Sequence, residues 1–129
     1  KFCLPFEEQA TFLKEGSTVV SGITAVEAFG HSPGHMAFNV ETDGQRLFLW
    51  ADVTNNAVLS LQRPRWAVHF DHNGPQAIAT RLRTLDMVSN DRCLAIGFHM
   101  PFPGFGYVDK HAEGYQWVPA QYQFNFKAE

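Results

Sequence analysis

Two histidines and one aspartate stand where expected apolar strands meet loops, and their side chains are of the types that bind transition metals. His35 precedes one apolar segment, Asp52 follows the next, and His99 leaves a third and opens a loop. Two imidazoles and a carboxylate would suit zinc, iron, manganese or cobalt, so this trio is a candidate metal site. Histidines scattered through a fold more often make ordinary hydrogen bonds, and spacing alone leaves that alternative open.

A β-hairpin is expected to bring the first two of these residues together. The segments 37–40 and 47–50 are largely apolar, and Asp43-Gly44 between them is typical of a type I′ turn. Because a hairpin returns the chain to the end from which it started, the residues that flank its two strands become neighbours. His35 and Asp52 should therefore lie side by side.

The other expected strands and one helix indicate a mixed α and β fold. Residues 18–29, interrupted at Ser21-Gly22, predict two short strands, and residues 115–118 predict a last strand. The apolar run 93–98 predicts a strand covered on both faces. Residues 100–106 predict an aromatic loop rich in glycine and proline.

The clearest helix is expected over residues 76–89. Its expected buried face consists of the apolar residues Ile78, Leu82, Leu85 and Val88. Pro75 suits the first helical turn, and Asn73 or Asp71 is expected near the cap. Arg81 and Arg83 are expected to face water, with ion pairs across the layer as the alternative.

Three further sets of residues carry weaker hypotheses. His31 would either orient a metal ligand or bound water, or simply hydrogen-bond the backbone of its loop. His69 and His72, on either side of Asp71, could form a surface metal pair, although ordinary surface histidines are favoured. Three aromatic residues that follow His99 would wall a substrate pocket or only pack their loop: Phe102, Phe105 and Tyr107.

At these positions the chain resembles the carboxyl-terminal half of the metallo-β-lactamase superfamily. The closer likeness is to the branch that contains methyl parathion hydrolase and related lactonase-like enzymes. The motifs are Gly30-His31-Ser32-Pro33-Gly34-His35, then Ala51-Asp52, then Gly97-Phe98-His99 with Pro101-Phe102-Pro103-Gly104 behind it. The resemblance covers residues 18–120, and Ala51 replaces the glycine that usually precedes the aspartate.

The resemblance implies an α+β fold that is half of an αββα sandwich, with one mixed sheet layer and one main helix. It also implies two divalent metal ions, zinc first, with His35 as a ligand of one, His99 as a ligand of the other, and Asp52 bridging both. A metal-bridging hydroxide would attack a small lactone, ester or phosphotriester, and the two cations would stabilise the oxyanion.

One departure from the family pattern is serious. The principal signature, His-x-His-x-Asp-His, is absent, since no two of the six histidines are separated by a single residue. Residues 1–129 are therefore interpreted as a single domain, the carboxyl-terminal half of a binuclear hydrolase whose amino-terminal half is absent. Such a fragment should bind metal weakly or not at all and be inactive alone. Its uncovered sheet face should drive homo-oligomerisation or pairing with the missing half.

A non-catalytic remnant of the same fold, acting as a binding or assembly module, is the alternative function. The sequence offers little support for other partners. Its 129 residues carry a formal net charge of −3 and no basic stripe, which argues against nucleic acid. No apolar run approaches the roughly 18 residues of a membrane span. Cys3 and Cys93 do not suggest a disulfide framework, and the compartment stays open because an export signal would stand before Lys1.

Overall fold

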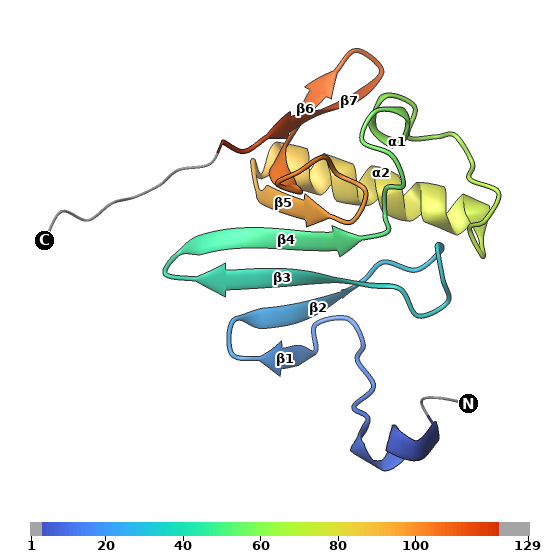
Figure 1. The fold of residues 1–129 in the computed structure, drawn as a ribbon, viewed down its shortest axis with the longest axis vertical. Coiled ribbons are helices and arrows are strands. Elements are labelled where there is room, and N and C mark those ends of the chain that lie inside the picture. The colour runs from blue at the N-terminus through green and yellow to red at the C-terminus, as the bar shows by residue number, and fades with distance from the viewer. Residues whose placement is uncertain (1–3, 122–129) are drawn as a thin grey trace, which may run out of the picture.

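The structure, a computed structural model, describes residues 4–121 and contains one seven-stranded sheet (Figure 1). In chain order its elements are a short 3₁₀ helix η1 (Leu4–Gln9), β1 (Thr18–Val20), β2 (Ile23–Glu27), β3 (Met36–Thr42), β4 (Gln45–Ala51), α1 (Leu59–Gln62), α2 (Gly74–Asn90), β5 (Leu94–Gly97), β6 (Phe105–His111) and β7 (Gly114–Pro119). The strands follow one another in sequence order across the sheet. Only β4 and β5 pair in parallel, and the other neighbours are antiparallel. The predicted α+β class is confirmed.

The predicted hairpin is formed by β3 and β4. Thr42 pairs with Gln45, which leaves a two-residue turn. Asp43 and Gly44 in that turn have φ angles of 49° and 73°. Two consecutive positive φ angles match a type I′ turn, which aspartate and glycine accommodate with little strain. The two short strands expected over residues 18–29 are β1 and β2.

Helix α2 provides the crossover between the two parallel strands. Asn73 caps it, since its Oδ1 accepts a hydrogen bond of 3.1 Å from the backbone amide of Gln76. The buried face differs from the prediction and consists of Ala77, Thr80, Arg81, Thr84, Leu85 and Val88. Only two of the four predicted apolar residues are buried, because Ala77 lies against Gly30 and the side chains of Thr80 and Arg81 hydrogen-bond to backbone carbonyl oxygens. Arg81 is buried as well, so its predicted exposure was wrong.

The sheet has two unlike faces. In Figure 1, α2 lies across the face of the sheet behind β4 and β5. The core between the two layers includes Phe48, Trp50, Leu85, Val88 and Trp117. On the opposite face, the strand register aligns Phe38, Leu49 and Ile96, which are only half-buried. Strand β5 is therefore fully buried on one face only, and the predicted coverage of residues 93–98 on both faces was wrong.

Strand β6 was not predicted from the sequence. The breaker-rich segment before it obscures its start, but the strand itself alternates: Gly106 and Val108 are buried, whereas Tyr107 and Asp109 are exposed. Cys93, just before β5, is a buried free thiol, and Cys3 lies outside the described residues. Within residues 4–121, no helix has the length and apolarity to cross a membrane.

Candidate metal centre

The ends of β4 and β5 bring Asp52 and His99 into contact. The Nε2 atom of His99 lies 2.9 Å from Oδ1 of Asp52. His35, from the loop before β3, reaches the same place, since its Nε2 accepts a 3.1 Å hydrogen bond from the backbone amide of Asp52. The three residues singled out in the sequence thus meet at one edge of the sheet, as the hairpin and the parallel β4–β5 pairing require.

His35 has hydrogen bonds on both ring nitrogens. Its Nδ1 donates to the carbonyl oxygen of Ala28 at 2.9 Å, which leaves Nε2 free to accept from the Asp52 amide. The residue is 9% exposed. Ala51, which directly precedes Asp52, has a φ of 50°, in the left-handed region that favours glycine. His35 therefore fixes the backbone that presents Asp52.

His31 approaches the same aspartate from the other side. Its Nε2 lies 4.0 Å from Oδ2 of Asp52, while His99 faces Oδ1. One carboxylate is thus flanked by an imidazole at each of its two oxygens. The Nδ1 of His31 lies 2.9 Å from Oδ1 of Asp71 and donates to that carboxylate. Nε2 of His31 is then the nitrogen with a lone pair, and it faces Asp52.

Behind His31 lies a buried ion pair. The side chains of Asp71 and Arg81 are each 1% exposed, with 3.7 Å between Oδ2 and Nη2. Burial lowers the pKa of Arg81, and the nearby Asp71 carboxylate opposes that shift. Of the two residues expected near the cap of α2, Asn73 is the cap and Asp71 is not. No local pattern in the sequence links Asp71 to His31, because 40 residues separate them.

The residue types at this centre match those that bind zinc and related ions. The Nδ1–H of His31 is hydrogen-bonded to a carboxylate, an arrangement common for histidines that ligate a metal through the other nitrogen. A carboxylate and two imidazoles form a suitable mixed donor set. In residues 4–121, no group of three or more His, Cys, Asp or Glu side chains is arranged so as to hold a metal by itself. The donors fit a metal in kind but would need additional ligands.

The other candidates have different surroundings. Asp71 contacts His31 and Arg81, so it does not join His69 and His72 in a surface cluster. The ring of His69 instead packs edge-on against Phe70, with 5.2 Å between centroids. Arg83 donates to the carbonyl oxygen of Glu27 from an exposed position on α2.

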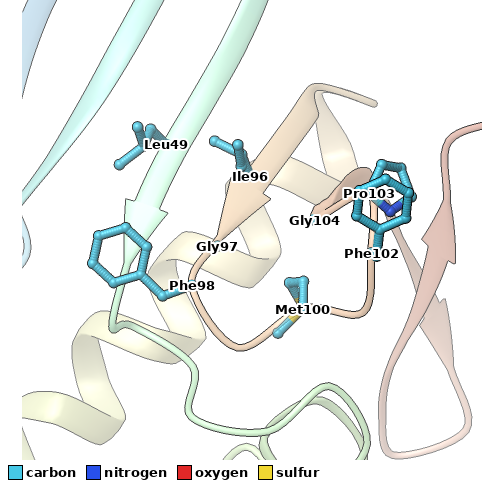
Figure 2. A pocket seen from close by; sticks show the side chains of 8 residues that line it. All are labelled: Leu49, Ile96, Gly97, Phe98, Met100, Phe102, Pro103 and Gly104. Atoms are coloured by element: carbon cyan, nitrogen blue, oxygen red, sulfur yellow. The ribbon is translucent and has the colours of Figure 1, made fainter.

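A hollow lies at the end of β5 (Figure 2), and its lining includes Phe98 and Met100, the two chain neighbours of His99. It has a volume of about 360 Å³ and is lined by Leu49, Ile96, Gly97, Phe98, Met100, Phe102, Pro103 and Gly104. Figure 2 shows Leu49, Ile96 and Phe98 on one side and Phe102 on the other. Of the three aromatic residues proposed to wall a pocket, Phe102 lines this hollow, whereas Phe105 and Tyr107 do not.

No protein-family model matches the sequence, and no curated protein matches it. Solved structures do match in fold. AidC, a dizinc quorum-quenching lactonase in complex with the product N-hexanoyl-L-homoserine, superposes over 88% of this chain and 39% of its own, with a TM-score of 0.82 and 25% identity. The hydrolase AbOPH of the β-lactamase superfamily covers 95% of this chain and 43% of its own, with a TM-score of 0.80 and 22% identity.

A probable metal-dependent hydrolase from Staphylococcus aureus covers 85% of this chain and 40% of its own, with a TM-score of 0.65 and 17% identity. For AbOPH and for the Staphylococcus aureus hydrolase, the likeness concerns the fold alone. The chain spans about two fifths of the length of these three structures. The solved structures to which it is similar are hydrolases of the metallo-β-lactamase superfamily.

Proposed function

We propose, from the premise that this chain has the fold of metallo-β-lactamase superfamily hydrolases, that it carries one part of a metal-dependent hydrolytic site. The proposed metal-binding atoms are Nε2 of His31, the carboxylate of Asp52 and Nε2 of His99. The observation that carries the proposal is the placement of one imidazole at each oxygen of Asp52. The Asp52 carboxylate and the two histidines would together hold the divalent ions.

This proposal exchanges the roles that the sequence suggested for His31 and His35. Both nitrogens of His35 are engaged with backbone groups, and the residue is nearly inaccessible. His31 has one nitrogen on a buried carboxylate and the other directed at Asp52. We therefore assign His31 to the metal and His35 to the support of the Asp52 backbone, and the two assignments are distinguishable by experiment.

Divalent ions at such a site supply Lewis-acid stabilisation of developing negative charge and lower the pKa of bound water. The chain's own contribution is to fix the donors. The parallel pairing of β4 with β5 sets Asp52 beside His99. The hydrogen bond from the Asp52 amide to His35 fixes the backbone at Asp52. The apolar hollow at the end of β5, lined in part by Phe98 and Met100, would receive the uncharged part of a small substrate.

We propose that the substrate is a small lactone, ester or phosphotriester. Support comes from AidC, which was solved with an acyl-homoserine product, and from the apolar lining of the hollow. Zinc usually takes three or four protein ligands, and two histidines with one shared aspartate fall short of that number. The remaining ligands would have to come from further polypeptide, so residues 1–129 alone should bind zinc weakly and turn over no substrate.

The open face of the sheet supports association with further polypeptide or with a second copy. Phe38, Leu49 and Ile96 align across it and are only half-buried. Covering such a face would remove apolar surface from water. Sedimentation of the purified chain would test this, because a monomer at all concentrations would contradict self-association.

The alternative function is a binding or assembly module that uses no metal. It is favoured by the incomplete ligand set among the described residues. Titration of the purified protein with zinc separates the two hypotheses. We expect His31→Ala and His99→Ala each to weaken zinc binding, whereas the exposed control His111→Ala binds zinc as the wild-type chain does. Equal zinc in all three variants would contradict the proposed ligands and favour the module.

Hydrolysis should be measured with N-hexanoyl-homoserine lactone, p-nitrophenyl acetate and a p-nitrophenyl phosphotriester, each with and without added zinc. The proposal predicts that any protein in which the site is complete hydrolyses at least one of these compounds in a zinc-dependent manner. It also predicts that His31→Ala and His99→Ala abolish that hydrolysis. Activity that survives both substitutions would show that the reaction occurs elsewhere.

A further inference from the structure

The segment before α2 holds a carboxylate whose surroundings are unusual for an acidic residue. The Asp71 side chain is 1% exposed, and its Oδ2 is buried without a hydrogen bond. Its Oδ1 accepts from Nδ1 of His31 at 2.9 Å. Burying a carboxylate costs free energy unless it is paired, so the partners of Asp71 indicate what its burial achieves.

Arg81 supplies the opposite charge, and it is itself rigidly held. Its guanidinium donates to three backbone carbonyl oxygens, those of Val53 at 3.0 Å, Pro64 at 3.1 Å and Trp66 at 2.9 Å. Its Nη2 lies 3.7 Å from Oδ2 of Asp71, which is longer than a hydrogen bond. Arg81 therefore neutralises the charge of Asp71 without a hydrogen bond to it, and connects the loops whose carbonyl oxygens it binds. Oδ1 of Asp71 remains the acceptor for His31.

Backbone hydrogen bonds also join the loop that carries His31 to the segment that precedes α2. The amide of His72 donates to the carbonyl oxygen of His31 at 3.1 Å, and the amide of Asn73 donates to that of Gly30 at 2.9 Å. A side chain at position 30 is excluded, because a Cβ there would lie 2.3 Å from the backbone nitrogen of Ala77. The loop that carries His31 is thus fixed against the start of α2, so the short Asp71–His31 contact depends on two rigid segments.

We propose that Asp71, held by Arg81, is a positioning residue that keeps His31 protonated on Nδ1 and directs its Nε2 at Asp52, ready to bind a divalent cation. The inference rests on the proposed function, since it assigns a purpose to the orientation of a proposed ligand. A neutral histidine side chain in water prefers the proton on Nε2, which would block that atom as a ligand. A carboxylate facing Nδ1 reverses the preference, because only a protonated Nδ1 can donate to it.

The position of the ring proton can be read directly by NMR on the ¹⁵N-histidine-labelled chain, at a pH where histidine is neutral and without added metal. We expect His31 to be in the Nδ1–H form in the wild-type chain. His35 is an internal reference, because its Nδ1 donates to the Ala28 carbonyl independently of Asp71. In Asp71→Ala, His31 should change to a mainly Nε2–H form while His35 stays as it was.

The conservative variant Asp71→Asn keeps a carbonyl oxygen at the position of Oδ1, so we expect it to restore much of the Nδ1–H form. Asp91→Ala, which removes an exposed carboxylate paired with Arg46, is the matched control and should leave His31 unchanged. Unchanged histidine resonances at His35 would show that a variant is folded. An Nε2–H form of His31 in the wild-type chain overturns the proposal whatever the variants do.

Zinc titration of the same samples separates this inference from the proposed function. We expect Asp71→Ala to weaken zinc binding at His31 and His99 by about 10–100-fold, the usual effect of losing a partner that orients a ligand. If zinc leaves both histidines unperturbed in the wild-type chain, the proposed function fails while the tautomer result stands. If zinc binds equally well to Asp71→Ala and His31 keeps its Nδ1–H form, the role of Asp71 is overturned and the metal site stands.

Discussion

The two imidazoles that flank Asp52 are held in very different ways. His31 lies in a loop hydrogen-bonded to the start of α2, its Nδ1 bonded to a buried aspartate, and its side chain is 26% exposed. The side chain of His99 is 50% exposed, and its ring is hydrogen-bonded to Asp52. His31, the core-anchored half of the centre, is therefore fixed by buried residues. His99, the other half, is held by the loop that carries it and by Asp52.

The difference indicates that the fold holds His31 more rigidly than His99. Arg81, Asp71 and His31 form a continuous connection from the interior to Asp52, so the position of His31 does not depend on a bound ion. His99 stands on the loop after β5, and half of its side chain is exposed to solvent. We expect His31 to be ordered before a metal binds and His99 to become ordered when it binds.

The substitution Arg81→Met should have the largest effect on stability. It removes a guanidinium that satisfies three carbonyl oxygens and leaves Asp71 as an uncompensated buried charge. Breaking a buried ion pair in this way costs about 3–5 kcal/mol. Urea unfolding of both proteins would give the difference in the free energy of unfolding.

Arg83→Met is the matched control, because Arg83 lies on the same helix but is exposed and donates to one carbonyl oxygen. Its cost should be below about 1 kcal/mol. Equal losses for the two variants would contradict the view that the core-anchored half of the centre depends on Arg81.

The next largest effect is expected for Gly30→Ala. Gly30 has a φ of 129°, and an added Cβ would lie 2.3 Å from the backbone nitrogen of Ala77. Overpacking and left-handed backbone strain each cost about 1–3 kcal/mol, so we expect a loss of about 3 kcal/mol. In the same loop, a Cβ at Gly34 would meet nothing within 4 Å. Gly34→Ala should change stability by less than about 1 kcal/mol, and a comparable loss at both glycines would show that the loop is not fixed by α2.

His31→Ala and His99→Ala compare the two halves directly. Removing His31 leaves a buried oxygen of Asp71 without its donor, at a cost of about 1–3 kcal/mol. Removing His99 breaks one contact at an exposed position and should cost less than about 1 kcal/mol. Thermal unfolding without metal measures both, and a larger loss for His99→Ala would reverse the comparison.

The smallest effect concerns a contact between α2 and β7, the strand at the end of the sheet. Burial and a hydrogen bond to Asp86 raise the pKa of Tyr115 to about 12 from its ordinary value of 10.0. Because the folded chain retains this proton more strongly than the unfolded chain, the contribution is complete below about pH 10 and is lost as the pH rises toward 12. Tyr115→Phe should cost about 1 kcal/mol at neutral pH and weaken the alkaline loss of stability.

Denaturation of wild-type and Tyr115→Phe chains between pH 8 and pH 12 would measure that change. The ring resonances of His31 and His99 should not move in this variant, because these rings are hydrogen-bonded to Asp71 and Asp52 and not to Tyr115. A shift of either histidine would indicate coupling that the geometry does not account for.

Local patterns in the sequence predicted the elements whose form depends on nearby residues. Asp43-Gly44 fixed the hairpin, and the hairpin placed His35 near Asp52. The helix and the approach of His99 to Asp52 also followed from patterns along the chain. These features depend on turn conformation, helical periodicity and the pairing of adjacent segments.

The features that the sequence did not reveal depend on contacts between distant segments. Asp71 meets His31 across 40 positions, and Arg81 is buried because three backbone carbonyls from other loops satisfy its guanidinium. An arginine in an amphipathic helix is ordinarily solvated, so periodicity gave the wrong environment for it. The distinct roles of His31 and His35 could be argued only once the hydrogen-bond partner of each ring nitrogen was known.

The most direct test is the anomalous scattering of zinc in crystals of the protein grown or soaked with the ion. We predict a peak beside the Asp52 carboxylate, within bonding distance of Nε2 of His31 or His99, with His35 still bonded to Ala28 and to the Asp52 amide. A peak on His35, or at His69 and His72 with none at Asp52, would contradict the proposed centre.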